Sequence, residues 1–331
     1  MAIVYQSVGR PLGRANSSQA PCFQNVRGDK MNIFLPVLLT VLSPVFTNVN
    51  GKSLGVVVWH GMGDSGFGSG VKHLCQMIKD EIPGTYVLDV EIGSSSFIDR
   101  LHSFFMPVNK QLNIVCEMIH SNPNLSGGFH LIGFSQGGLF VRALAQRCPP
   151  AVLGSVISIG GPQQGVFGMP FCPNATSLPL CSFLRNMLSK VAYTDFVQSH
   201  FVQAQYWHDP FNEALYREKS QFLAEINQEK VQNQTYKNNL LKAANLVLVR
   251  FMHDVTVIPG ASEWFGFYRS GKSDDVYDIK ESKQYKTDSL GLKTLDEEGR
   301  LHLIPLPGHH LQFSDEWFRK VIIGQFLKSR I

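Results

Sequence analysis

The chain has few charged residues for its length, and the patterns that identify metal-binding and nucleic-acid-binding proteins are missing. Only 17% of its 331 residues are charged, the net charge is +4, and no block of lysines and arginines stands out. A protein that binds nucleic acid would need the basic patch that this composition lacks. No cysteines have C-x-x-C spacing and no histidines have H-E-x-x-H spacing. We therefore expect neither a zinc site nor a nucleic-acid partner.

Long apolar runs are scarce, and the longest one lies near the start of the chain. Arg27 and Lys30 stand just before residues 31–50, which consist of a short apolar core followed by small polar residues, and this is the layout of a secretory signal peptide. The apolar core is too short to span a bilayer comfortably. We predict that translation from Met31 gives the natural precursor and that residues 1–30 are an N-terminal extension. No segment of the mature chain is predicted to cross a membrane.

Cysteine is also scarce, but its distribution suits an oxidising compartment. Five of the six cysteines follow the predicted signal, and an odd number leaves at least one thiol free. Three N-x-S/T sequons follow the signal as well, and each is a glycosylation site where it is exposed. These sequons begin at Asn124, Asn174 and Asn233.

Strand-like and helix-like segments alternate over residues 51–163, and this alternation predicts a parallel sheet covered on both faces. From residue 164 to residue 244 the pattern is mainly helical, with many glutamines, asparagines and aromatic residues. Strand patterns resume at 245–251, and a last helix with Ser314 as its N-cap ends the chain. We predict an α/β core formed by 51–163 and 245–331, interrupted by an insertion at 164–244.

One serine stands in a sequence that favours a nucleophile. Residues 133–137 read GFSQG, which matches G-x-S-x-G. An apolar strand pattern precedes Ser135 and an amphipathic helix pattern follows it, as the nucleophile turn of an α/β-hydrolase requires. The flanking glycines avoid clashes where strand and helix meet. The alternative is a serine that only caps the helix.

A serine nucleophile needs a base, and this fold predicts the chain order Ser, acid, His, with each partner in a loop after a strand. Asp254 follows the strand pattern at 245–251. The adjacent His309 and His310 follow the last strand pattern, and spacing does not choose between them. Weaker candidates for the acid, which lack a clear preceding strand, are Asp275, Asp278 and Asp288.

The third requirement is a pair of backbone donors for the oxyanion that develops on the substrate carbonyl. The residue after the serine, Gln136, should supply one N–H. The glycine-rich loop HGMGD, at residues 60–64, should supply the other, and Met62 is the candidate. The alternative for this loop is a tight turn that binds nothing.

Longer stretches of the sequence resemble the lysosomal palmitoyl-protein thioesterases. The resemblance runs from about Gly55 to the C-terminus and includes unusual aromatic segments in the same order. The matching segments include WHGMGDS, GFSQGG, AQRCP, GVFGMPFCP, QAQYWHDP, SEWFGFYRSG and HLQFSDEWF. It implies an α/β-hydrolase with a mostly parallel central sheet, in which the insertion forms a lobe with an apolar groove for a fatty chain.

The resemblance also assigns roles to particular residues. Ser135 would be the nucleophile, Asp254 the orienting acid and His310 the base. The free thiol would be that of Cys75, and the implied disulfides join Cys116 to Cys148 and Cys172 to Cys181. The family's adjacent cysteine pair after GDS is missing here, since Gly66 and Phe67 follow Ser65.

Together these inferences predict a hydrolase that removes long-chain fatty acyl groups from cysteine thioesters of S-acylated proteins or peptides. The reaction would pass through an acyl-enzyme on Ser135 and would need no metal or organic cofactor. The resemblance places the protein in the lysosome, reached by the secretory pathway, with secretion as a second destination. A lipase or carboxylesterase would share the triad, and a lipid-binding protein with a silent triad is the alternative from a different class.

Overall fold

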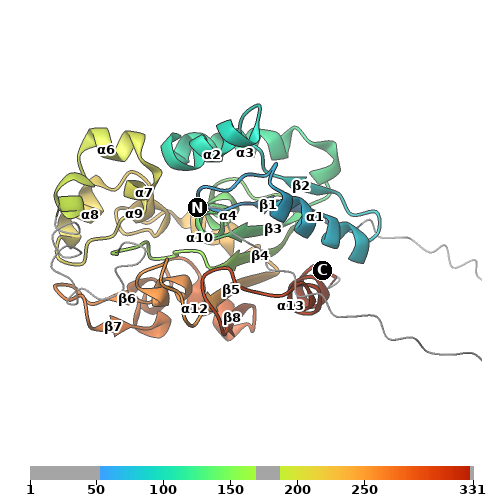
Figure 1. The fold of residues 1–331 in the computed structure, drawn as a ribbon. Coiled ribbons are helices and arrows are strands. Elements are labelled where there is room, and N and C mark those ends of the chain that lie inside the picture. The colour runs from blue at the N-terminus through green and yellow to red at the C-terminus, as the bar shows by residue number, and fades with distance from the viewer. Residues whose placement is uncertain (1–52, 169–186, 329–331) are drawn as a thin grey trace, which may run out of the picture. The chain divides into compact units, whose positions relative to one another are not determined.

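The central feature of the fold is a sheet of six parallel strands in the order β2-β1-β3-β4-β5-β8 (Figure 1). The computed structural model describes residues 53–168 and 187–328. The strands are β1 (Gly55–Trp59), β2 (Val87–Asp89), β3 (Phe129–Phe134), β4 (Leu153–Ile159), β5 (Asn245–Phe251) and β8 (Leu301–Leu306). Across the middle of the sheet Val58 pairs with Ile132, Ile132 with Ile157, and Ile157 with Val247. These apolar runs suit a parallel sheet that is buried on both faces.

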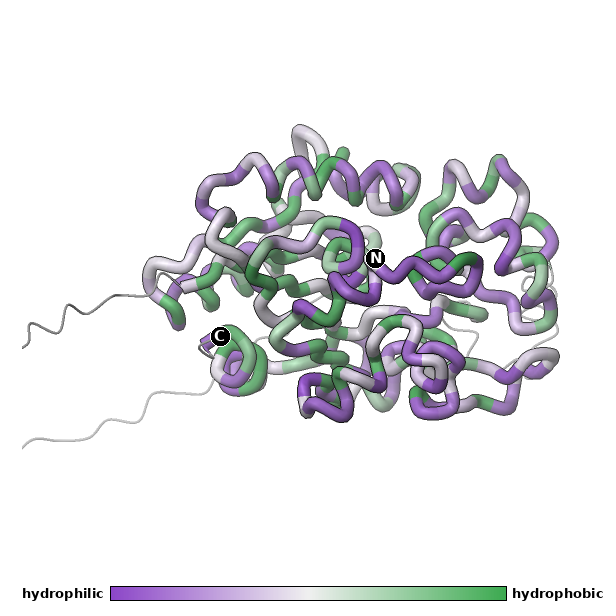
Figure 2. The backbone as a smooth tube through the Cα atoms, turned by 180° about the vertical axis from the view of Figure 1, so that it is seen from behind, coloured by the Kyte–Doolittle hydropathy of each residue, from purple (hydrophilic) through white to green (hydrophobic). Residues whose placement is uncertain are grey.

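Helices cover both faces of this sheet. Alternate residues of β1 point to opposite sides: Val58 packs in the cluster that contains α1 (Ser69–Glu81) and the C-terminal π-helix η4 (Phe318–Leu327). Val57 belongs to the cluster that contains α3 (Val108–His120) and α4 (Gln136–Arg147). Hydrophobic and hydrophilic residues alternate along the outer helices in Figure 2, because these helices bury one side and expose the other, whereas α4 is buried along almost its whole length.

Shorter elements complete the described chain. They are α2 (Ser96–Phe105), η1 (Pro123–Leu125), α6 (Asp195–His200), α7 (Val202–Gln205), α8 (Glu213–Lys219), α9 (Leu223–Ile226), α10 (Gln234–Leu240), η2 (Gly260–Trp264), β6 (Phe267–Tyr268), β7 (Val276–Tyr277), η3 (Ile279–Glu281), α11 (Lys283–Lys286), α12 (Leu292–Glu297) and α13 (Asp315–Trp317). At the end of the chain the Ser314 hydroxyl accepts a hydrogen bond from Trp317 N–H at 3.2 Å, which confirms the predicted N-cap. Where the sequence predicts one α-helix, the structure has α13 followed by η4.

Helices α6 to α10 lie between β4 and β5, where the sequence predicts the insertion. A second excursion, between β5 and β8, packs against them: β6 supplies Phe267, whose ring stacks on His208 at 4.2 Å between centroids. Gln284 of α11 accepts a hydrogen bond from Gln164 at 2.8 Å. Figure 1 shows β6 and β7 beside this helical group. The lobe therefore draws on more of the chain than the continuous range 164–244.

The cysteines and sequons are only partly covered by the described residues. A disulfide joins Cys116 of α3 to Cys148, which follows α4. Cys75 is a free, buried thiol, and burial raises its pKa to about 12. Three further predicted sites, Cys172, Cys181 and Asn174, lie outside the described residues, as do the predicted extension 1–30 and the predicted signal peptide 31–50. Among the helices of the described residues, none combines the length and apolar character needed to cross a bilayer.

Candidate active site

Ser135 lies on a strained turn between β3 and α4. Its backbone has φ 52° and ψ −123°, a conformation that residues other than glycine rarely adopt. The flanking glycines make the turn possible, because a Cβ atom on Gly133 would lie 2.1 Å from the carbonyl oxygen of Gly137. A Cβ atom on Gly137 would lie 2.4 Å from the carbonyl oxygen of Trp59. This is the local geometry of a nucleophile elbow, which presents the serine hydroxyl at the carboxyl end of the sheet.

The structure brings Ser135, His310 and Asp254 together from three distant parts of the sequence. His310 Nε2 lies 2.8 Å from Ser135 Oγ, and His310 Nδ1 lies 2.5 Å from Asp254 Oδ2. The side chain of His310 is 12% exposed and that of Asp254 is fully buried. The imidazole therefore has one nitrogen on a carboxylate and the other on a hydroxyl, the arrangement that lets a histidine take the proton of a serine.

Asp254 is held as a carboxylate. Its Oδ1 accepts hydrogen bonds from the backbone N–H groups of Thr256, at 2.6 Å, and Val257, at 3.0 Å. Burial raises the pKa of Asp254, but the hydrogen bonds from His310 and from the backbone outweigh it, and the pKa lies below its ordinary value. An ionised Asp254 orients the imidazole and stabilises its cationic form.

The other candidates for the acid and the base lie elsewhere. His309 is exposed, and its Nδ1 hydrogen-bonds the backbone oxygen of His253 at 3.0 Å. The three weaker carboxylate candidates interact with other groups: Asp275 with Arg269 and Lys272, Asp278 with the N-terminus of η3, and Asp288 with Lys237. The structure therefore chooses between alternatives that spacing had left open.

The loop after β1 approaches Ser135 closely, and the buried side chain of Asp99 contacts it from the other side. A Cβ atom on Gly61 would lie 3.1 Å from the Cβ atom of Ser135. His60 Nε2 lies 3.3 Å from Asp99 Oδ2, and both of these side chains are buried. Asp99 also accepts hydrogen bonds from Gly66 N–H and Ile92 N–H, both at 2.9 Å. Asp99, on α2, is a residue that the sequence reasoning missed, because nothing in its local pattern shows what its carboxylate contacts.

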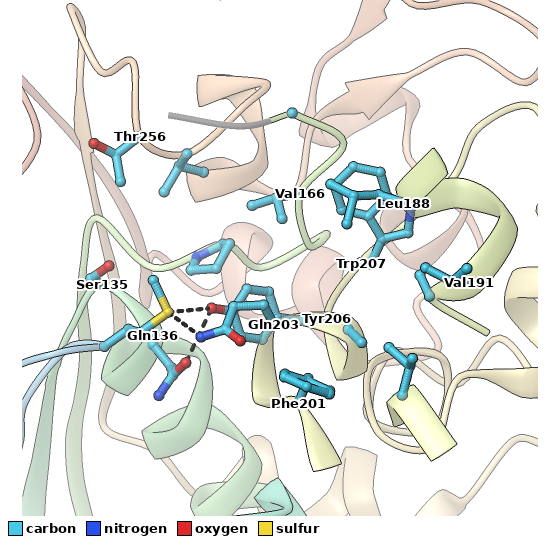
Figure 3. A pocket seen from close by; sticks show the side chains of 17 residues that line it. Ser135, Gln136, Val166, Leu188, Val191, Phe201, Gln203, Tyr206, Trp207 and Thr256 are labelled. Atoms are coloured by element: carbon cyan, nitrogen blue, oxygen red, sulfur yellow. Dashed lines mark hydrogen bonds between the residues drawn. The ribbon is translucent and has the colours of Figure 1, made fainter. Parts of the chain in front are cut away.

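Two residues of the inserted lobe hold the side chain of Met62. Gln203 Nε2 contacts the Met62 sulfur, and the Tyr206 hydroxyl lies 3.7 Å from it (Figure 3). The same hydroxyl donates to Gln136 Oε1 at 3.1 Å. The lobe thus contacts both residues whose backbone N–H groups are the predicted oxyanion donors. Tyr206 and Gln203 were not identified from the sequence, although both belong to the aromatic segment QAQYWHDP.

An apolar pocket of about 460 Å³ begins at Ser135 and extends into the lobe (Figure 3). Its walls come from three parts of the chain: the loops around Ser135, the lobe helices and the loop after β5. Besides Met62, Ser135 and Gln136, the lining residues include Pro162, Val166, Leu188, Val191, Ala192, Val197, Phe201, Tyr206, Trp207 and Val257. Few of these side chains are polar, so the pocket suits a hydrocarbon chain.

A parallel sheet with this nucleophile elbow, and with an aspartate, a histidine and a serine linked by hydrogen bonds at its carboxyl edge, defines an α/β-hydrolase fold. The profile of the palmitoyl protein thioesterase family matches residues 55–310, and the chain belongs to this family.

Several known proteins are similar to the chain. Palmitoyl-protein thioesterase 1 of Caenorhabditis elegans is 42% identical over 297 residues, which cover 88% of this chain and 96% of the relative. The lysosomal thioesterase PPT2 of Rattus norvegicus is 32% identical and covers 83% of this chain and 88% of its own length. Among solved structures, an esterase of Pyrococcus furiosus is 13% identical with a TM-score of 0.41, covering 84% of this chain and 85% of its own.

Proposed function

We propose that this protein hydrolyses long-chain fatty acyl thioesters of S-acylated cysteines, with Ser135 as nucleophile, His310 as base and Asp254 as orienting acid. The observation that carries the proposal is the position of the Ser135 hydroxyl, which lies 2.8 Å from His310 Nε2 and lines an apolar pocket of about 460 Å³. The names of the relatives favour a thioester over other substrates, since they are palmitoyl-protein and lysosomal thioesterases.

The reaction would proceed through a covalent intermediate. His310 takes the proton of Ser135 as its oxygen attacks the thioester carbonyl, and the backbone N–H groups of Met62 and Gln136 bind the resulting oxyanion. The C–S bond breaks as His310 passes its proton to the cysteine sulfur, which leaves as a thiol whose ordinary pKa is about 8.5, and an acyl-Ser135 ester remains. His310, neutral again, takes a proton from water as the water attacks the ester, and returns it to the Ser135 oxygen as the fatty acid is released. None of these steps needs a metal or an organic cofactor.

Selectivity for long acyl chains would come from burial in the pocket. Each methylene transferred from water to an apolar wall contributes about 0.8 kcal/mol, so every few carbons change affinity substantially. Lobe residues such as Val197 and Trp207 supply that wall. The lobe would therefore determine which acyl chain lengths bind well, while the residues at the carboxyl edge of the sheet would carry out the reaction.

We also propose that the protein acts in the lysosome, reached by the secretory pathway, with secretion as a second destination. One relative is named as a lysosomal enzyme. Two of the predicted glycosylation sites, Asn124 and Asn233, are exposed. At Asn233 the side-chain oxygen caps α10 by accepting from Thr235 N–H at 3.0 Å, so the side-chain nitrogen is the group left for a glycan.

The test compares a palmitoyl thioester with a palmitoyl oxygen ester of matched leaving-group size, using the wild type and Ser135→Ala. We expect the wild type to have the higher kcat/KM on the thioester and the variant to lose both activities. A fluorophosphonate should label Ser135, located by peptide mass spectrometry. A higher kcat/KM on the oxygen ester would instead identify a lipase or carboxylesterase. Absence of both labelling and turnover would indicate a lipid-binding protein.

A further inference from the structure

A second carboxyl group, that of Glu263, is buried beside the triad. Glu263 belongs to η2, and only 1% of it is exposed. Its Oε2 accepts a hydrogen bond from Phe251 N–H at 2.8 Å, whereas Oε1 is buried and has no hydrogen-bond donor among the described residues. A buried acceptor without a partner is costly, so this oxygen needs an explanation.

The surroundings of Glu263 contain another carboxylate instead of a paired cation. Oxygen atoms of Glu263 and Asp254 and a ring nitrogen of His310 all lie within 4.8 Å of one another. The cation that faces this site, Arg250 of β5, stacks its guanidinium over Trp264, 5.4 Å from the ring centroid. Among the described residues no ion pair or hydrogen bond joins Arg250 to Glu263, and the Nε atom of Arg250 has no hydrogen-bond partner there. Two carboxylates this close and this buried cannot both be ionised without a large energetic cost.

A proton on Glu263 would explain both the buried oxygen without a donor and the close approach of two carboxyl groups. We propose that Glu263 is a positioning residue that remains protonated and donates a hydrogen bond from Oε1 to the Asp254 carboxylate, which fixes Asp254 against His310. The proposal rests on the triad assigned above. It accounts for the buried oxygen without a donor, and it leaves a single negative charge facing the imidazole.

The electrostatics of the pair agree with this assignment. Burial, and then the neighbouring Asp254, raise the pKa of Glu263 well above its ordinary value, while the pKa of Asp254 is lowered. Two interacting acids whose pKa values move apart in this way share one proton. A neutral donor orients Asp254 without adding a second negative charge, which would favour the protonated and inactive form of His310.

Two substitutions separate a positioning role from a structural one. Glu263→Gln keeps an acceptor for Phe251 N–H and supplies an amide N–H to Asp254, so we expect kcat within about threefold of wild type and an unchanged acid limb of the kcat/KM profile. Glu263→Ala removes both hydrogen bonds. We expect its kcat to fall by about 10- to 100-fold with KM nearly constant, because the triad loses its alignment. Thermal unfolding of both variants checks that each one folds.

The pH profile decides the charge of Glu263. If Glu263 were ionised, Glu263→Gln would remove a negative charge near His310 and shift the acid limb of kcat/KM to lower pH by about one unit or more. Such a shift overturns the proposal. So does a Glu263→Ala enzyme with wild-type kcat.

A spectroscopic measurement on the wild type needs no turnover and no substitution at Glu263. With the glutamate side-chain carboxyls labelled with ¹³C, exposed glutamates titrate near their ordinary pKa of about 4.3. We expect the Glu263 signal to keep the shift of a protonated acid at pH 7. Glu229→Gln assigns the signal of Glu229, whose Oε2 is buried and whose pKa is also raised. If no protonated signal remains at pH 7 apart from that of Glu229, Glu263 is ionised and the proposal is wrong, whatever Ser135→Ala shows about the nucleophile.

Discussion

His310 of the triad and His208 of the lobe each contact a carboxylate, but they have different second partners. His310 has Asp254 on one ring nitrogen and the Ser135 hydroxyl on the other. His208, inside the lobe, has Glu213 Oε1 at 3.1 Å on Nε2 and the backbone oxygen of Gln164 at 2.9 Å on Nδ1. A hydroxyl can give up a proton, whereas a carbonyl oxygen can only accept a hydrogen bond.

The difference favours a structural role for His208. Both of its partners are acceptors, and only the protonated imidazole can donate to both of them. The ring also stacks between Tyr216, at 3.9 Å, and Phe267, at 4.2 Å, and aromatic faces attract a cation. Burial lowers the pKa of His208, but Glu213, Glu229 and the Gln164 carbonyl outweigh it and leave the pKa raised. A buried histidine beside a carboxylate is therefore not evidence of catalysis until the other nitrogen is examined.

The largest expected effect comes from removing His310, the proposed base. His310→Ala should lower kcat on a palmitoyl thioester by about 10⁴- to 10⁶-fold, because Ser135 loses its base. His309→Ala is the matched control, since His309 is adjacent in the sequence but exposed and bonded to His253. Steady-state kinetics of the two variants measure the difference. Equal losses of kcat in both variants would mean that His309 and His310 maintain the structure of the loop and that His310 is not the base.

The sequence predicts well which side chains lie together beside Ser135, because these residues occupy local patterns. Ser135 lies within G-x-S-x-G between a strand and a helix, and Asp254 directly follows an apolar strand. Parallel strands end at the same edge of a sheet, so residues that follow different strands meet there. The strand order itself follows from pairing between segments far apart, such as β5 with β8, and the sequence does not reveal it.

The contacts that support the site could not be predicted, for a physical reason. The Asp99 carboxylate contacts Gly66 and the Tyr206 hydroxyl of the lobe contacts Gln136, and in each pair the two residues are at least 30 positions apart. Glu263 lies near His310 only because the chain folds. Local periodicity carries no information about such pairs. The doublet of His309 and His310 shows the same limit, because two adjacent residues share one local pattern but point to different partners.

The next largest effect concerns stability. His208→Gln should lower the free energy of unfolding by about 3–5 kcal/mol, because it removes one partner of a buried charge pair. The kcat of the folded enzyme should change little, since His208 does not contact Ser135. Denaturant unfolding measures the loss. The control is His73→Gln, in which an exposed histidine 2.8 Å from Asp315 is removed and less than about 1 kcal/mol should be lost.

A smaller effect on kcat/KM is expected from a change in the pocket, which adjoins Ser135 and not the pair of His208 and Glu213. Ser135 lines the apolar pocket and His208 does not. Val197→Asp places a charge on the pocket wall and should weaken binding of a palmitoyl thioester as much as the loss of two or three buried methylenes, about 2 kcal/mol or 30-fold in kcat/KM. A butyryl thioester buries far fewer methylenes against the pocket wall, so its hydrolysis should be affected much less. Val231→Asp, at a position that is 77% exposed, is the control. Equal loss on both substrates would contradict the assignment of the pocket to the acyl chain.

The smallest effect tests whether His208 is charged. Glu213→Gln keeps an acceptor near His208 but removes a negative charge, so the pKa of His208 should fall towards its unfolded value of about 6.5. A histidine whose folded pKa is raised stabilises the protein fully below its unfolded pKa, and this contribution is lost as the pH rises through the folded pKa. We therefore expect the wild type to exceed the variant in free energy of unfolding by about 1–2 kcal/mol at pH 5, and by progressively less as the pH increases to 9. Glu229, whose pKa burial raises, titrates in both proteins and largely cancels from the difference. A difference that stays constant from pH 5 to pH 9 would mean that His208 is neutral and that Glu213 acts on it only as a hydrogen-bond acceptor.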